Sequence, residues 1–209
     1  MSKSLPNIIY STDKLVPVVD SNTALYTLSF TKGIEYFSNS DAASKFINGV
    51  EKEVRTCDRY KKYIDFLKKE VKLNRCQVLS ELTDDDVPIE MHHGPIFNLY
   101  DYCSIMIEYF LYKKWKITSF RIADMVMKEH EANRVQVVML SSTIHEAVHN
   151  RDIFINYKQG FGDIKGFIDK YSIVFLPEHI EKLNRYIDRS LMMDSNDNDV
   201  LKLSPKIGG

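Results

Sequence analysis

The segment VQVVMLSSTIHEAVHN, residues 135–150, determines the predicted fold of this chain. Its first six residues form an apolar, β-branched run interrupted only by Gln136, a pattern typical of a buried strand. The residues from Thr143 predict a short helix on which His145 and His149 stand four positions apart. Residues at i and i+4 share a helix face, with Cβ atoms about 5 to 6 Å apart, so both imidazoles can bind one metal ion. The segment therefore predicts a strand followed by a helix that carries part of a metal site.

A second histidine pair stands upstream, at the end of another predicted strand. An acidic turn at residues 83–86 leads into a strand over Val87–His92, and His93, Gly94 and Pro95 follow. These two groups contain four of the six histidines in the chain. The sequence therefore places two strands and one short helix around a common site, with histidines on the first strand and on the helix.

Helices are predicted on both sides of these strands. The helical patterns run from Ser40 to Val71 as two helices or one bent helix, over Ile96–Tyr112, from Thr118 to Glu131, and onward from Pro177. Short strands are predicted at Asn7–Tyr10, Ala24–Phe30 and Cys76–Leu79. Strands interrupted by helices, without alternating βαβ units, favour an α+β fold.

The same patterns divide the chain into three parts. Residues 1–75 form a strand-and-loop start followed by basic helices, and residues 76–193 hold the histidine site with a helical insert at 96–131. Residues 194–209 are polar and acidic and predict a flexible tail.

Composition limits the classes of function. The chain has 209 residues, with 28 basic and 29 acidic side chains, so its net charge does not indicate a nucleic-acid partner. Three cysteines are too few for a disulfide framework, which favours a reducing compartment. The most apolar stretch, residues 96–115, contains four charged residues, so no membrane span is expected. We therefore expect a cytoplasmic protein.

Residues 136–149 align without a gap with the pattern N-L-x-x-L-C-x-x-C-H-x-x-x-H. His92 to Pro95 is similar to the pattern H-H-x-x-P, with the proline one position early. Both patterns belong to the HNH, or ββα-metal, endonuclease family, and the chain resembles HNH-like proteins encoded by bacterial viruses. Gln136 stands at the family's asparagine, and Ser141 and Ile144 replace its two zinc-binding cysteines, so no second metal is expected.

The resemblance implies an α+β fold with a ββα-metal core, a helical insert and flanking helices. It also implies that His92, His145 and His149 hold one divalent metal ion, which is Mg²⁺, Mn²⁺, Ni²⁺ or Zn²⁺. His93 would act as the general base, with Gln136 in a supporting role. A phosphodiester needs an activated water, a base with a pKa near neutrality and a cation that neutralises developing charge. We therefore expect a phage-encoded, metal-dependent endonuclease that hydrolyses DNA.

Two other interpretations stay open. The letters His145-Glu146-Ala147-Val148-His149 also satisfy HExxH, the zinc metallopeptidase signature, in which Glu146 is the general base. Its third ligand would come from Asp163, Asp169, Glu178 or His179. Glu146 is otherwise explained as part of a capping box with Thr143. The chain can also be a non-catalytic binding or structural module that retains a degenerate HNH site.

The remaining candidates are single histidines and basic clusters. His130 continues an apolar helix face and is expected in the core or at an interface, whereas His179 is expected at the surface. Residues 55–75 contain eight basic and three acidic side chains, a local excess that can follow a phosphate backbone. The residues predicted to contact DNA are Arg59, Lys61, Lys62, Lys68, Lys69, Lys113 and Lys114.

Overall fold

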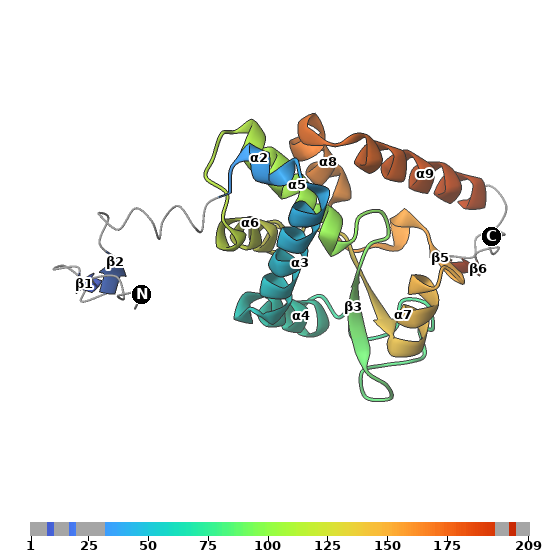
Figure 1. Ribbon diagram of the computed structural model, residues 1–209. Coiled ribbons are helices and arrows are strands. Elements are labelled where there is room, and N and C mark those ends of the chain that lie inside the picture. The colour runs from blue at the N-terminus through green and yellow to red at the C-terminus, as the bar shows by residue number, and fades with distance from the viewer. Residues whose placement is uncertain (1–7, 11–16, 20–31, 195–200, 204–209) are drawn as a thin grey trace.

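The computed structural model describes residues 8–10, 17–19, 32–194 and 201–203. Within these residues the chain has a mainly helical α+β fold, with eight α-helices and three small two-stranded antiparallel sheets (Figure 1). The α+β class predicted from the sequence is therefore confirmed. None of the helices in the described part of the chain is long and apolar enough to cross a membrane.

The helices occupy most of the described chain. They are α2 (Ile34–Phe37), α3 (Ser40–Thr56), α4 (Asp58–Lys69), α5 (Leu99–Tyr112), α6 (Ser119–Glu131), α7 (Ser142–His149), α8 (Ile164–Tyr171) and α9 (Pro177–Asp194). Two 3₁₀ turns, η1 (Tyr157–Gln159) and η2 (Ser172–Val174), flank α8. The strand pairs are β1 (Ile8–Tyr10) with β2 (Pro17–Val19), β3 (Ile89–His93) with β4 (Val137–Ser141), and β5 (Ile153–Ile155) with β6 (Leu201–Leu203).

The hydrophobic core lies around α5. This helix is apolar on almost every side, and a helix of that kind is stable only when other elements cover it. Buried side chains run along its length, among them Tyr102, Ile105, Met106 and Phe110. Helices α3 and α6 pack against α5 and against each other (Figure 1). The predicted insert is therefore part of the main core.

Most predicted elements are present, with small shifts of their ends. The helical stretch after Ser40 forms two helices that meet at Cys57, and α5 and α6 match the predicted helices closely. The predicted strand at Cys76–Leu79 is wrong, because this segment is irregular. It still follows the edge of β4, since the amide of Gln77 donates to the Met139 carbonyl (2.8 Å) and the Met139 amide donates to Oε1 of Gln77 (2.7 Å). The backbone and side chain of Gln77 thus form hydrogen bonds with β4 that a neighbouring strand would otherwise form.

The ends of the chain carry three further predictions. The predicted strand at Ala24–Phe30 lies outside the described residues, while β1 lies within the predicted segment Asn7–Tyr10. Strand β6 lies within the predicted C-terminal tail and pairs with β5. The proposed boundaries at residues 75 and 193 stay predictions.

The two central strands and α7 form one unit. In the β3–β4 pair, His92 lies opposite Val138 and His93 opposite Val137. Helix α7 begins directly after β4, so it folds back beside the pair (Figure 1). Helices α5 and α6 lie between β3 and β4 in the sequence. This order of strand, insert, strand and helix is the one that the sequence predicted.

Candidate metal centre

Three histidines from two elements meet on one face of this unit. His92 lies on β3, and His145 and His149 lie one turn apart on α7. One ligand nitrogen from each of the three lies within 4.8 Å of the others. The ring centroid of His92 is 5.0 Å from that of His145 and 5.1 Å from that of His149. We call these three residues the histidine cluster. The structure therefore brings together all three predicted metal ligands.

Hydrogen bonding orients the imidazole of His145. Its Nδ1 lies 2.6 Å from Oε2 of Glu90, so Nδ1 carries a proton and donates a hydrogen bond to the carboxylate. The other nitrogen, Nε2, is then left with a lone pair directed at the cluster. Nε2 of His149 lies 3.0 Å from it. A carboxylate that fixes the tautomer of a histidine in this way is common around protein-bound metal ions.

The histidine cluster is electrically suited to a cation. Burial is the main cause that lowers the pKa of His92, to about 3, and the neighbouring imidazoles of His145 and His149 add to it. Partial burial and the neighbouring His145 also lower the pKa of His149. Neutral imidazole is the form that binds metal. His92 and His149 are therefore in the binding form at neutral pH.

Gly94 keeps space open beside His92. Its φ of +150° lies in a region that other residues rarely adopt. A Cβ atom added at Gly94 would lie 3.1 Å from Nε2 of His92, which is closer than most Cβ contacts. A larger residue at this position would therefore press on the histidine cluster.

His93 lies on the opposite face of β3 and does not join the histidine cluster. Strand β3 stays regular through His93, which pairs with Val137, so neighbouring side chains alternate between the two faces. The His93 ring is buried, stacks against Tyr60, and its Nε2 lies 2.9 Å from Nε2 of His130. A histidine in this position cannot exchange a proton with a water molecule at the cluster.

The tautomers of this buried pair follow from their partners. Nδ1 of His130 lies 2.8 Å from the carbonyl oxygen of Val126, so it donates its proton there. Nε2 of His130 is then an acceptor, and Nε2 of His93 donates to it. Burial lowers the pKa of His93 well below its ordinary value and that of His130 to about 4. The core position predicted for His130 is confirmed.

Gln136 supports the loop after β5 and does not contact the histidine cluster. Its backbone amide donates to the hydroxyl of Tyr102 (2.9 Å), and its side-chain Nε2 donates to the carbonyl of Tyr157 (2.6 Å). The side chain is almost fully buried. Gln136 therefore attaches η1 to the strand that leads into α7.

The third histidine of the cluster is not the ligand that the peptidase interpretation requires, because that ligand should follow the HExxH segment in the sequence. Within the described chain the residue that completes the histidine cluster is His92, which precedes the HExxH segment. Among the proposed downstream ligands, Asp163 caps α8 and Asp169 pairs with Lys165. His179 is buried beside Phe97 and Phe175, so its predicted surface position is wrong. Its Nδ1 accepts a hydrogen bond from the amide of Leu176 (3.1 Å).

The capping box predicted for α7 is also absent. The helix begins one residue earlier than predicted, at Ser142, and its N-cap residue Ser141 makes no side-chain capping bond. Thr143 and Glu146 therefore both lie inside the helix, where Glu146 is exposed to solvent.

Ion pairs neutralise several of the basic residues predicted to contact DNA. Arg59 is held at 2.7 Å by both Asp124 and Glu131, and Lys68 pairs with Asp84 at 2.8 Å. The longer pairs are Lys61 with Asp58 (3.9 Å) and Lys69 with Asp65 (3.6 Å), and Lys113 lies over the rings of Tyr109 and Tyr112. The exposed lysines Lys62 and Lys114 have no acidic partner within the described residues. DNA contact at these positions stays a prediction.

The residue that the sequence analysis missed is Glu90. It stands two positions before His92, so the period of a strand places both side chains on one face of β3. This spacing was a usable signal, because a carboxylate beside a metal-ligating histidine commonly orients its ring.

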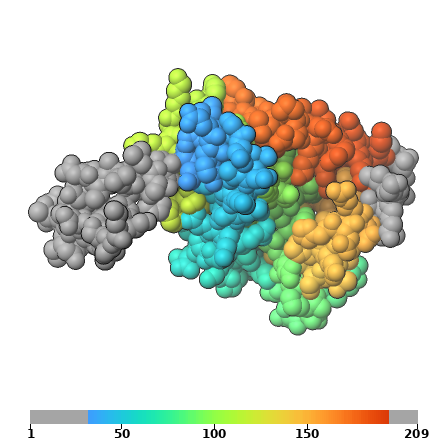
Figure 2. Space-filling view, viewed as in Figure 1, coloured from blue at the N-terminus to red at the C-terminus, as the bar shows by residue number. Residues whose placement is uncertain are grey.

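The fold and the histidine cluster define a small, mainly helical α+β protein with a candidate metal centre. The segment that contains α7 lies at the surface of the molecule (Figure 2). A family model for the Bacteriophage G278-like virion protein matches residues 9–206, and the chain belongs to this family. No curated protein and no solved structure matches the chain.

This assignment corrects the predicted function. The chain is a phage virion protein, so its assignment to the HNH family and the predicted endonuclease activity are wrong, although the prediction of a phage protein is confirmed. The HNH resemblance covered about a third of the chain and depended on a few histidines, whereas the family match extends over nearly all of it. The buried position of His93 agrees with this correction, because the predicted mechanism required that residue to face the metal.

Proposed function

We propose that this virion protein is a non-catalytic structural component whose histidine cluster holds one divalent cation on a ββα frame. The observation that carries this proposal is the arrangement around His145. Glu90 holds its Nδ1, and its Nε2 lies 3.0 Å from Nε2 of His149. One ligand nitrogen from each of His92, His145 and His149 lies within 4.8 Å of the others. Three imidazoles, one of them oriented by a carboxylate that is hydrogen-bonded to it, fit a divalent transition metal.

The position of the histidine cluster explains how a cation would stabilise the fold. His92 belongs to β3, which forms a two-stranded sheet with β4, and a two-stranded sheet is weakly stable by itself. A cation shared by His92 and the two α7 histidines would link β3 to a helix some fifty residues further along the chain. Binding to the folded state alone stabilises it, by about 2.7 kcal/mol when the free metal is 100 times Kd.

The donor set favours zinc or nickel over magnesium. Imidazole suits zinc, copper and nickel, whereas magnesium and manganese prefer oxygen ligands. Among the residues that the structure describes, the carboxylate bonded to the histidine cluster is that of Glu90, and it is already used by His145. We therefore propose one Zn²⁺ or Ni²⁺ ion per chain.

Two further proposals concern location and partner. All three cysteines of the chain are unpaired, which supports synthesis and folding in the reducing cytoplasm of the host cell before incorporation into the particle. Lys62 and Lys114 are exposed, which supports weak, salt-dependent contact with nucleic acid.

Metal analysis and calorimetry on three proteins test the proposed function. The wild-type chain is expected to bind one equivalent of Zn²⁺, and His149→Ala is expected to lose this binding. Glu146→Gln is the matched control, because Glu146 is exposed on the same helix and does not belong to the histidine cluster. It should bind zinc as the wild type does.

Unchanged zinc stoichiometry and affinity in His149→Ala would show that the metal lies elsewhere. Supercoiled plasmid incubated with the wild-type protein and Mg²⁺, Mn²⁺, Ni²⁺ or Zn²⁺ should stay intact. Nicking that disappears in His149→Ala would contradict the non-catalytic part of the proposal.

A further inference from the structure

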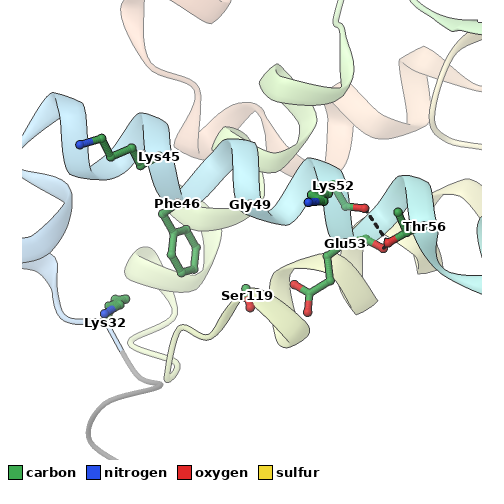
Figure 3. A pocket seen from close by; sticks show the side chains of 8 residues that line it. All are labelled: Lys32, Lys45, Phe46, Gly49, Lys52, Glu53, Thr56 and Ser119. Carbon is green, nitrogen blue, oxygen red and sulfur yellow. Dashed lines mark hydrogen bonds between the residues drawn. The ribbon is translucent and has the colours of Figure 1, made fainter.

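A cavity of about 570 Å³ opens on the surface beside α3, on the side that faces the start of α6 (Figure 3). Its lining includes Phe46 and Gly49 from α3 and Ser119, the first residue of α6. None of its lining residues belongs to the histidine cluster. The cavity is therefore a second candidate site, independent of the proposed metal.

Positive charge surrounds this cavity. Lys32, Lys45 and Lys52 line it, and Glu53 is the only acidic residue among the described lining residues, which leaves a net charge of +2. None of the three lysines forms an ion pair with an acidic side chain within the described residues. In Figure 3, Lys32 and Lys45 lie at the end of the cavity away from Glu53. That end is therefore suited to an anion.

An aromatic side chain lies between the two ends of the cavity. Phe46 packs edge-on against Phe37, with ring centroids 5.3 Å apart, and against Tyr36 at 6.1 Å. Its ring projects from α3 into the space bounded by Lys32 and Ser119 (Figure 3). The neighbouring aromatic rings fix its position, so Phe46 offers a rigid apolar surface to a ligand.

Gly49 leaves open space at the wall of the cavity. It lies in the interior of α3, where glycine destabilises a helix relative to alanine. No packing requirement explains it, because a Cβ atom at this position would have no heavy atom within 4 Å. A glycine one turn from Phe46 does, however, allow a ligand to approach the helix backbone closely.

From these features we propose that the cavity binds a ligand with two or more phosphate groups joined to a flat ring, in a free nucleotide or along a single nucleic-acid strand. The phosphates lie at the Lys32–Lys45 end, and the ring stacks on Phe46 above Gly49. Lysine binds phosphate as a concentrated positive charge, and stacking on an aromatic side chain tolerates any base.

The shape of the site favours this ligand over two other anions. A duplex would present its phosphates along a convex surface and could not bring a base to Phe46. An acidic peptide would meet the lysines but has no flat ring to use the aromatic wall and the space at Gly49. Phosphate and ring together match all the features of the cavity.

Titration with ATP, a single-stranded 6-mer oligonucleotide and a hexaglutamate peptide tests the proposal. The wild-type protein should bind ATP or the oligonucleotide, and the tighter of the two identifies the source of the phosphates. The double variant Lys32→Ala/Lys45→Ala should weaken that binding at least tenfold. The matched control is Lys165→Ala, which removes an exposed lysine of α8 outside the cavity.

Gly49→Leu provides a variant that fills the cavity without weakening the helix, because leucine is a good helix former. It should also weaken binding at least tenfold, while circular dichroism and the unfolding temperature show a folded protein. Equal binding of ATP and of the oligonucleotide by the wild type and both cavity variants would overturn the proposal. So would hexaglutamate binding as tightly as the phosphate ligands, or no binding of any phosphate ligand at millimolar concentration.

Discussion

The two faces of β3 show how one pair of adjacent histidines takes two different roles. His92 faces α7, where it meets the imidazole of His149 and that of His145, which Glu90 orients. His93 faces the core, where His130 accepts a hydrogen bond from it and Tyr60 stacks on its ring. The residue type is the same on both faces, and the neighbours differ. A pattern of adjacent histidines therefore does not by itself identify a catalytic pair.

The difference lies in which lone pairs remain available. In the His93–His130 pair, the two Nε2 atoms bond to each other, and the backbone carbonyl of Val126 accepts from Nδ1 of His130. In the histidine cluster, Glu90 uses the outer nitrogen of His145 and leaves the inner one for a cation. We therefore expect substitutions on the core face to change stability and substitutions on the cluster face to change metal affinity.

The largest effect is expected on the core face. His93→Ala removes a buried ring, leaves a cavity beside Tyr60 and leaves Nε2 of His130 without a partner. The free energy of unfolding should fall by about 3 kcal/mol, measured by urea denaturation. Zinc affinity of the folded variant should stay within about threefold of the wild type. A large loss of zinc affinity with unchanged stability would reverse the roles assigned to the two faces.

The next effect is a pH dependence that arises from His130. Its pKa is about 4 in the folded protein because burial disfavours the charged ring, against an ordinary value of 6.5. As the pH falls, His130 therefore binds a proton in the unfolded chain at a higher pH than in the folded protein. This protonation favours the unfolded chain, so the free energy of unfolding decreases as the pH falls from about 6.5 to 4. The loss amounts to about 3 kcal/mol.

Denaturation of the metal-free protein at several pH values measures this loss, with His130→Gln as the comparison. The variant is less stable at pH 7, but its stability should decline less between pH 6.5 and 4. Parallel curves for the two proteins would show that His130 is not the group responsible.

A smaller effect is expected for Glu90, the residue that orients His145. Glu90→Ala removes the acceptor for Nδ1 of His145, so the ring can rotate or change tautomer. Zinc affinity should fall by about 10- to 100-fold, the usual result of losing a carboxylate that is hydrogen-bonded to a ligating histidine. Stability without metal should change little, because Glu90 is exposed. Calorimetry that finds equal zinc affinity in both proteins would remove Glu90 from the proposed site.

The smallest effect is expected for His149→Ala without metal. His149 is exposed at the end of α7, so the free energy of unfolding should change by no more than about 0.5 kcal/mol. Excess zinc should then stabilise the wild type and leave the variant unchanged. A loss of several kcal/mol without metal would instead give His149 a packing role.

Much of this fold was predictable because it follows from local patterns. The apolar run before Ser141, the i, i+4 histidines and the helical periodicity of α5 and α6 are all local, and each predicted its element to within a few residues. The convergence of His92 with His145 and His149 was predictable as well. It required only that two strands pair and that the following helix fold back on them.

Other features depended on tertiary contacts that no local pattern shows. Which face His93 takes depends on whether β3 bends at Gly94, and the strand stays regular up to that residue. The burial of His179 depends on Phe97 and Phe175, which are distant from each other in the sequence. The function was mispredicted for a related reason, since a short histidine pattern can form a metal site without the base and the exposed surface that catalysis needs.

X-ray absorption spectroscopy on the zinc-loaded protein tests the central claim most directly, because it reports the ligands of the bound ion. We expect three imidazole nitrogens at about 2.0 to 2.1 Å from zinc and no sulfur ligand. In His145→Ala this signature should be lost. A sulfur neighbour at about 2.3 Å, or a shell of oxygen atoms alone, would contradict the claim that the histidine cluster is the metal centre.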